Sequence, residues 1–186
     1  MCSSDLMTDT GFSVPPAKQF RIAQSLAIDP FTKTPNKILD VTMTPNNDSA
    51  GAGGVSTAGD YLNFISMLLN GGKLNGNRIL SPMTVQLMAS DMLGNRTTVP
   101  VSPGQNLMGV EGYTFGLGFM VRQSEGIAGV QGSPGEFMWA GAAGTFFWID
   151  PKEQMAVVMM SQVPGPMRPY YRKMIKQLVS AAVVSK

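Results

Sequence analysis

The chain has 186 residues, of which 44% are apolar and 14% are charged, and its 14 basic and 12 acidic side chains leave a net charge of +2. This length and composition predict one globular domain, or a large part of one, that can bury roughly 70% of the surface its unfolded form exposes. The basic residues are scattered and no apolar run approaches the ~20 residues of a membrane-spanning helix, which excludes a nucleic-acid-binding stripe, a polybasic membrane patch and a membrane span.

The sequence contains no histidine, and its one cysteine is Cys2. An internal disulfide, histidine metal ligands and a Ser-His-Asp or Cys-His triad are therefore excluded within this chain. No cluster of residues suggests a metal site, so we expect neither a metal nor another cofactor. The fifteen methionines are most simply explained as filler of irregular gaps in the core.

Residues 1–6 look unlike the sequence that follows them. They resemble the translation of a sequencing adapter, and we expect residues 1–6 to be a non-native leader and residues 7–186 to be the natural sequence. A charged leader followed by an apolar stretch, which would indicate a signal peptide, is not visible. The sequence leaves the compartment and the oligomeric state open.

The first quarter of the chain carries few signals of regular structure. Pro15-Pro16 predicts the start of a short, weak helix that reaches to about Leu26, because proline is tolerated in a first turn. Residues 29–47 carry three prolines among alternating polar residues, which indicates an irregular, largely extended surface segment. The glycine-rich residues 49–54 predict a tight bend; a phosphate loop is the functional alternative, but neither Gly-Lys-Ser/Thr nor G-x-G-x-x-G spacing is present.

The strongest predicted helix follows this bend. Ser56 is a good N-cap, and Gly71-Gly72 predicts the end of the helix, because glycine takes the left-handed conformation at low cost. Apolar side chains recur at helical spacing and predict one face packed on the core. The members of this face are Tyr61, Phe64, Ile65, Leu68 and Leu69.

A hairpin and a second helix are predicted next. Asn75-Gly76 is the strongest short-range hairpin signal and joins two very short strands within residues 73–78. Ser81 as N-cap and Pro82 in the first turn predict a helix that reaches to about Ser90.

The middle of the chain is predicted to form a loop, a strand and a second loop. Residues 92–111 are rich in glycine, proline and polar residues, and predict a long loop of the kind that often forms a functional rim. Residues 113–121 alternate aromatic or aliphatic side chains with Gly116 and Gly118, which predicts one strand with a narrow, glycine-lined face. Residues 123–135 predict a loop or a ragged hairpin.

Three consecutive strands are predicted at residues 136–140, 145–149 and 155–160. Aromatic and β-branched residues favour the second strand, and a continuous apolar run is typical of the third. Asp150-Pro151 predicts the turn between them. Small residues at 141–144 predict a sharp corner after the first strand, where another group can approach the backbone closely.

The chain ends in a predicted amphipathic helix over residues 170–184, preceded by a break at residues 164–166. Its apolar stripe consists of Tyr171, Met174, Ile175, Leu178, Val179 and Ala182, and its solvent side of Arg172, Lys173 and Lys176. Helices before and after a run of strands, without β-α-β alternation, predict an α+β fold: an antiparallel sheet, made of the C-terminal meander plus one earlier strand, with helices packed on it.

Several segments together carry a family resemblance. They are GVSTAGDYLNF at residues 54–64, MLLNGG at 67–72, ILSP at 79–82, the strand signal at 113–119 and WAGAAGTFFWIDP at 139–151. This set resembles the serine β-lactamase and penicillin-binding-protein superfamily, in the class C-like branch that includes many carboxylesterases. The resemblance runs from about residue 7 to the end and matches the C-terminal portion of that fold, so it implies an incomplete β-lactamase/transpeptidase-like fold.

The resemblance implies where the chemistry lies. In that family the serine of a Ser-x-x-Lys motif attacks a carbonyl, a lysine and a tyrosine handle protons, and a strand edge supplies part of the oxyanion hole. The edge motif often reads Trp-x-Gly in esterase-like members, which matches Trp139-Ala140-Gly141 here. By this match the backbone N–H of Ala142 is the oxyanion donor, and Trp139, Ala140 and Gly141 line the substrate pocket. The alternative for Trp139 is a purely structural role in the core.

The departures from the family pattern are equally informative. No Ser-x-x-Lys occurs in the chain. Tyr61-Leu62-Asn63 has the spelling of the family's Tyr-x-Asn motif, but Tyr61 lies on the core face of the strongest predicted helix. The resemblance also implies that an N-terminal part completes the sheet, so we expect a marginally stable or aggregation-prone chain with partly bare side chains. Those side chains are Phe146, Trp148, Val157 and Met159.

The resulting hypothesis is a C-terminal fragment of a serine hydrolase that acts on small-molecule esters or β-lactams through an acyl-enzyme and is inactive alone. Trp139 carries no positive charge for a β-lactam carboxylate, which slightly favours esters, although Arg122 or Lys152 could supply that charge. A non-catalytic ligand-binding domain of the same fold, and an interaction protein that uses a Met- and aromatic-rich surface, are the alternatives.

Overall fold

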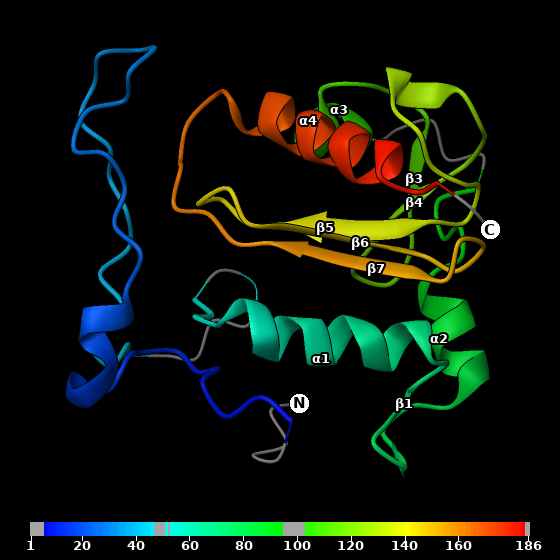
Figure 1. Cartoon of the computed structure of the whole chain (residues 1–186), viewed down its shortest axis with the longest axis horizontal. Helices are drawn as coiled ribbons and strands as arrows, with labels where there is room; N and C mark the ends of the chain where they lie inside the picture. The colour runs from blue at the N-terminus through cyan, green and yellow to red at the C-terminus, as the bar shows by residue number, and fades with distance from the viewer. Residues whose placement is uncertain (1–5, 47–50, 52, 95–102, 185–186) are drawn as a thin grey trace.

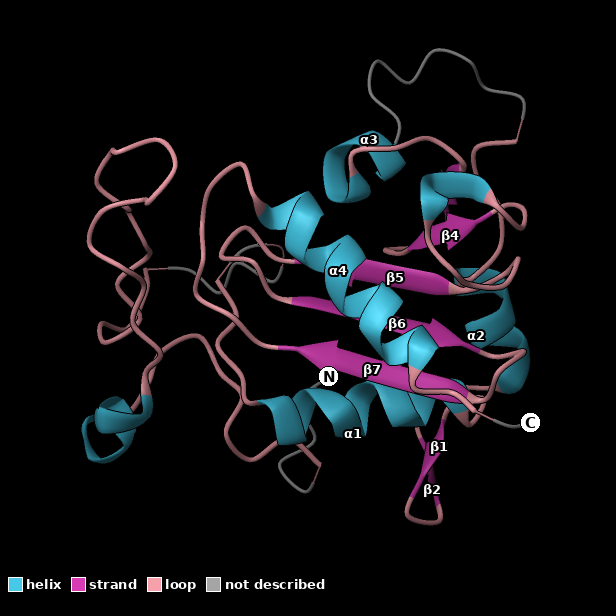
Figure 2. Cartoon of the chain, turned by 45° about the horizontal axis from the view of Figure 1, so that its top comes forward, coloured by secondary structure: helices cyan, strands magenta, loops and turns pink. Residues whose placement is uncertain are grey.

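The fold is built around a five-stranded antiparallel sheet. The computed structural model describes residues 6–46, 51, 53–94 and 103–184, and the statements below concern these residues. The strands follow one another in the sheet as β3-β4-β5-β6-β7 (Figures 1 and 2). Their bounds are β3 Tyr113–Phe115, β4 Met120–Arg122, β5 Phe137–Ala140, β6 Phe146–Asp150 and β7 Met155–Met159. The α+β fold and the C-terminal meander predicted from the sequence are confirmed.

Helices cover both faces of this sheet (Figure 1). Helix α1 (Ala58–Leu69) lies along one face, and α4 (Arg168–Ala181) lies on the other beside the short α3 (Pro103–Met108). Helix α2 (Pro82–Met88) adds Val85 to the apolar cluster under α1. No helix of the described residues is long and apolar enough to cross a membrane.

Strand β6 is the centre of the core, because all five of its residues are buried. Phe147 and Ile149 point into the cluster under α1, whereas Phe146 and Trp148 point into the cluster under α4. The expectation that Phe146 and Trp148 lie partly bare is therefore wrong, since α4 covers them. Val157 and Met159 of β7 are half-buried.

The single strand predicted over residues 113–121 is instead the hairpin of β3 and β4. Gly116 donates its N–H to the carbonyl of Phe119 at 2.8 Å, and Gly118 has φ +87, so the chain reverses here. A Cβ on Gly116 would lie 2.1 Å from the carbonyl oxygen of Met88. Gly116 and Gly118, which were predicted to line one narrow strand face, lie in the turn instead. The sheet therefore has two strands, β3 and β4, before β5, β6 and β7, where the sequence predicted one.

Local signals predicted the elements of residues 57–90 well. Helix α1 is capped by Thr57, whose side chain accepts from the N–H of Asp60, and not by Ser56. The hairpin of β1 (Lys73–Leu74) and β2 (Asn77–Arg78) turns at Asn75 and Gly76, both with positive φ. Ser81 caps α2, as predicted.

The long loop predicted over residues 92–111 contains α3, so it is not without structure; its residues 95–102 lie outside the described part. Residues 123–135 form a loop with one 3-10 turn, η2 (Ile127–Gly129). Of the bend predicted at residues 49–54, residues 49, 50 and 52 lie outside the described part.

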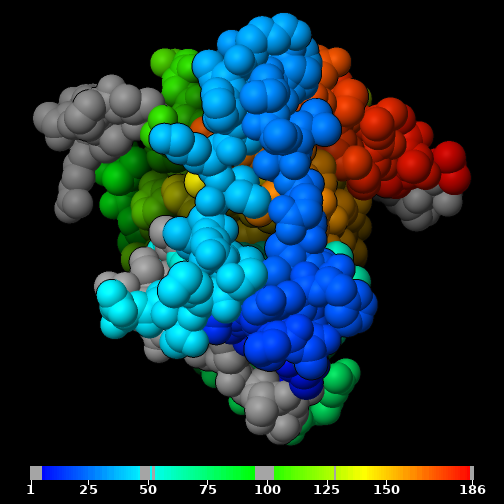
Figure 3. All heavy atoms as spheres, turned by 90° about the vertical axis from the view of Figure 1, so that its left-hand side faces the viewer, coloured from blue at the N-terminus to red at the C-terminus, as the bar shows by residue number. Residues whose placement is uncertain are grey.

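The N-terminal arm, residues 12–46, stands at one side of the body (Figures 1 and 3). Its one regular element is a 3-10 helix, η1 (Pro16–Arg21), so the helix predicted to reach Leu26 is wrong in type and length. Its remainder is irregular, as predicted. Residues before the arm attach to α1, where the Asp60 carboxylate accepts from Asp9 N–H at 2.7 Å and from Thr10 Oγ1 at 2.8 Å.

Helix α4 buries a different face from the one predicted. Arg172 and Lys176, assigned to the solvent side, are 2% and 1% exposed, whereas Leu178 is 60% exposed. Ile175 and Val179 do pack on the core. The rotation follows from the acceptors beneath the helix: Arg172 donates to the carbonyls of Leu107 and Gly141, and Lys176 donates to the Glu136 carboxylate. Buried charge is tolerated only where such partners exist.

Candidate active site

The corner, residues 141–144, joins the end of β5 to β6. Gly141 donates its N–H to the carbonyl of Thr145 at 2.9 Å, and Gly144 donates to the carbonyl of Gly141 at 3.1 Å. The carbonyl of Ala143 accepts from Val163 N–H at 2.7 Å, which ties the corner to the segment after β7. The corner is thus a tight, bonded turn and not a loose loop.

Glycine is required at two positions of the corner. Gly144 has φ +103, and a Cβ there would lie 2.6 Å from Ser161 Oγ and 3.0 Å from the Val163 carbonyl oxygen. A Cβ on Gly141 would lie 2.2 Å from Thr145 Oγ1. Any side chain at either position would displace its neighbours and reshape the turn.

The last part of β5 is open on one side. Strand β4 pairs with β5 only at Phe137 and Met138, so Trp139 and Ala140 have no strand partner on that side among the described residues. The Trp139 side chain is 37% exposed, and its ring packs edge-on against Phe115 with centroids 5.4 Å apart. Trp139 therefore borders the open strand end instead of filling the core.

The N–H of Ala142 has no acceptor in the part of the chain that the structure describes. Ala142 is exposed, and within the described part of the chain its N–H donates no hydrogen bond, whereas its carbonyl accepts from Arg168 Nη1 at 2.8 Å. The carbonyl of Gly141 accepts from Arg172 Nη2 at 2.9 Å. The two arginines hold the carbonyl oxygens of the corner, and the Ala142 N–H is left for another acceptor.

The corner lies in a positive electrostatic environment. Arg168 and Arg172 come from the first two turns of α4, whose N-terminal end adds a partial positive charge. No carboxylate of the described residues pairs with either guanidinium. Burial, followed by repulsion from Arg168, lowers the pKa of Arg172 to about 10, so this side chain remains protonated near neutral pH. Such a corner is suited to an anionic oxygen.

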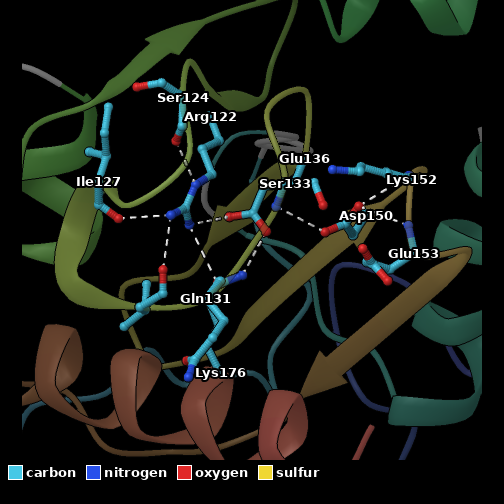
Figure 4. Close-up of polar contacts among 11 residues, drawn as sticks. Arg122, Ser124, Ile127, Gln131, Ser133, Glu136, Asp150, Lys152, Glu153 and Lys176 are labelled. Atoms are coloured by element: carbon cyan, nitrogen blue, oxygen red, sulfur yellow. Dashed lines mark hydrogen bonds and ion pairs between the residues drawn. The ribbon is translucent and has the colours of Figure 1, made fainter. Parts of the chain in front are cut away.

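The cations suggested by the sequence lie elsewhere. Arg122 is buried at the opposite end of β5, where its guanidinium donates to loop carbonyls and to Glu136 (Figure 4). Lys152 sits in the β6–β7 turn and pairs with Glu125 at 3.3 Å. The expectation that Arg122 or Lys152 supplies charge near Trp139 is therefore wrong. Arg168 and Arg172, the cations that do lie at the corner, were not identified from the sequence. Their spacing of four residues, which puts them on one side of a helix, was the signal that could have indicated them.

Tyr61 belongs to the core and not to the corner. Its ring packs against Phe64 at 5.5 Å and against Phe147 at 5.3 Å, and burial raises the pKa of its hydroxyl. Tyr61-Leu62-Asn63 thus resembles the family's Tyr-x-Asn motif in spelling only. Among the described residues, no group of three or more potential metal ligands gathers in one place.

The fold and the corner define a class of protein: an antiparallel sheet between helices, with a peptide N–H at the open end of a central strand that is unbonded among the described residues. Acyl-transferring enzymes direct a donor of this kind at an oxyanion. The chain belongs to the beta-lactamase family, whose model matches residues 4–180. The superfamily resemblance predicted from the sequence is confirmed.

Relatives of this chain are longer than it is. Protein Rv1367c of Mycobacterium tuberculosis is 33% identical over 165 residues, which cover 84% of this chain and 40% of that protein. The chain therefore spans less than half the length of the curated relatives it matches.

Solved structures show the same fold. EstCE1, a hydrolase with promiscuous acyltransferase activity, superposes with a TM-score of 0.69 at 21% identity and covers 91% of this chain and 46% of its own. The LovD9 mutant of simvastatin synthase from Aspergillus terreus gives 0.64 at 18% identity, covering 97% and 47%. A penicillin-binding protein homolog from Caulobacter crescentus gives 0.58 at 16% identity, covering 97% and 50%.

Proposed function

We propose that this chain is the C-terminal, oxyanion-binding portion of a serine hydrolase or acyltransferase that acts on small esters or β-lactams through an acyl-enzyme. The nucleophile and its proton-transfer partners would come from a part of the protein outside this chain, since no Ser-x-x-Lys occurs within it. The names of two solved structures with the same fold support acyl transfer. One is a hydrolase with promiscuous acyltransferase activity, and the other is a simvastatin synthase.

The observation that carries the proposal is the N–H of the exposed residue Ala142, which is unbonded among the described residues at the open end of β5. In this role the N–H donates to the oxygen that becomes negative as the nucleophile adds to the carbonyl. Gly141 keeps the strand edge free of side chains, and Ala140 and the half-exposed Trp139 border the acyl group.

A chimera tests this proposal. The part of Protein Rv1367c outside the matched 165 residues is fused to this chain in the order found in the relative, and hydrolysis of p-nitrophenyl butyrate and nitrocefin is measured. Ala142→Pro, which removes the N–H, should lower kcat by about 10²–10³-fold. Ala142→Gly, which keeps the N–H, is the matched control and should retain kcat within about threefold. Equal rates for the two variants would remove Ala142 from the oxyanion site.

The 186-residue chain alone gives a second test. We expect no turnover above background, because an oxyanion donor without a nucleophile has nothing to stabilise. Hydrolysis that disappears when a serine of this chain is replaced would contradict the proposal. A folded chimera that binds an ester without cleaving it would favour the non-catalytic ligand-binding alternative.

A further inference from the structure

Arg172 is a buried cation that has no counter-ion among the described residues. Its side chain is 2% exposed, and its two terminal nitrogens donate to backbone carbonyls, of Leu107 at 3.0 Å and of Gly141 at 2.9 Å. Its Nε is buried and has no hydrogen-bond partner among the described residues. Burying a charge opposite neutral carbonyls costs stability, so a purely structural role would be served more cheaply by a neutral donor.

The bond to Gly141 fixes the direction of the next N–H. Peptide units are planar and this one is trans, so the carbonyl of Gly141 and the N–H of Ala142 belong to one plane and point in opposite directions. Arg172 holds the oxygen from the side of α4, in addition to the turn bond that Gly144 N–H donates to the same oxygen at 3.1 Å. The Ala142 N–H is therefore directed away from α4.

We propose that Arg172 is a positioning residue for the oxyanion site: it locks the Gly141–Ala142 peptide in the donating orientation and places a positive charge directly behind it. This inference rests on the proposed function. A charge-assisted bond to the carbonyl also polarises the peptide, which strengthens its N–H as a donor to a developing anion.

Arginine suits this position better than lysine. Its planar guanidinium bridges the carbonyl of Leu107 in α3 and the carbonyl of Gly141 in the corner at once, and so sets the corner against two helices. A lysine ammonium would keep the charge but lacks the rigid fork needed to span both oxygens in fixed geometry.

Arg168 provides the matched control. It lies one turn earlier on α4 and also donates to a corner carbonyl, that of Ala142, at 2.8 Å. That oxygen shares its peptide with the N–H of Ala143 and not with the N–H of Ala142. The contact is solvent-exposed, so the charge is screened more strongly. Arg168→Met should therefore leave the Ala142 donor in place.

The rate arm of the test uses the chimera. Arg172→Met should lower kcat and kcat/KM together by about tenfold or more with little change in KM, because the contact acts mainly in the transition state. Arg172→Lys should retain more kcat than Arg172→Met, and Arg168→Met should retain kcat within about threefold. Equal losses in Arg172→Met and Arg168→Met, or a change confined to KM, would overturn the proposal.

The spectroscopic arm uses the 186-residue chain and needs no activity. The ¹⁵N–¹H resonance of Ala142 should move in Arg172→Met and stay in Arg168→Met, whose effect should fall on Ala143. An unmoved Ala142 resonance in Arg172→Met overturns the positioning role by itself. If Ala142→Pro keeps its rate in the chimera, the proposed function has failed; if Ala142→Pro is slow while Arg172→Met is not, only this inference has failed.

Discussion

Helix α4 presents two buried cations, one turn apart, to two ends of the same sheet. Lys176 meets a carboxylate, since its Nζ lies 2.8 Å from Glu136 Oε2, and it packs 4.7 Å above the Trp148 ring. Arg172, within the described ranges, donates only to backbone carbonyls. The same helix face therefore carries a neutralised cation at one end and an unneutralised cation at the other.

The neutralised end is a closed network (Figure 4). Glu136 accepts from Lys176 and Arg122, and the Arg122 guanidinium also donates to four loop carbonyls. Asp150 accepts from the N–H of Ser133 at 3.1 Å. This end holds the loop of residues 123–135 on the sheet. The corner, by contrast, keeps one donor exposed and its charge unbalanced, as a site for an anionic oxygen requires.

The largest effect is expected from Arg122→Met at the closed end. The change leaves the carbonyls of Ser124, Ile127, Val130 and Gln131 without this donor and Glu136 with one cation fewer. Breaking such a buried network costs about 3–5 kcal/mol. Urea unfolding followed by circular dichroism measures it.

The control for this prediction is Arg78→Met. Arg78 also donates to two carbonyls, of Gly71 and Leu80, both at 3.0 Å, but it is exposed. Water replaces the lost donor, so the expected cost is about 1 kcal/mol or less. Similar losses in the two variants would mean that burial does not distinguish the closed end.

A smaller effect is expected from Gly144→Ala in the corner. The new Cβ would meet Ser161 Oγ and the Val163 carbonyl, and φ +103 is unfavourable for alanine, which together cost about 1–3 kcal/mol. Gly135→Ala is the matched control, because its φ is +86 but nothing lies within 4 Å of its Cβ. The difference between the two unfolding free energies isolates the contact at the corner. No difference would show that the corner can relax.

The elements that the sequence predicted are those with local causes. Asn75-Gly76 makes a turn by its own backbone preferences, and Ser81-Pro82 begins a helix by capping it. The meander strands were placed within about two residues by their apolar runs. The prediction of one strand over residues 113–121 was wrong, because the alternation of side chains does not show that Gly116 packs against the carbonyl of Met88.

The sequence predicted the strand that carries the candidate site, but not the arginines that bond to the corner. Trp139 and Ala142 were identified from a resemblance, and the roles assigned to them stay predictions. The prediction placed Arg172 in solvent, whereas it is buried, because a helical stripe of apolar residues does not show which carbonyls of α3 and of the corner lie beneath the helix. Polar partners of this kind are tertiary, and they decide which face of α4 is buried.

The smallest effect is a difference in pH dependence between the two ends. Burial raises the pKa of Glu136, although Lys176 and Arg122 oppose the rise and Asp150 adds to it. The carboxyl of the folded chain therefore holds its proton more tightly than that of the unfolded chain. Its contribution to stability is fully present below the ordinary pKa of 4.5, and it is lost as pH rises through the raised pKa. Glu136→Gln cannot titrate, so wild type should lose stability relative to this variant as pH rises from about 4.5 towards neutral. Arg172→Met should run parallel to wild type over the same range, because the pKa of Arg172, about 10, lies above it. Urea unfolding at several pH values compares the three chains, and a wild type that gains on Glu136→Gln with rising pH would contradict the assignment.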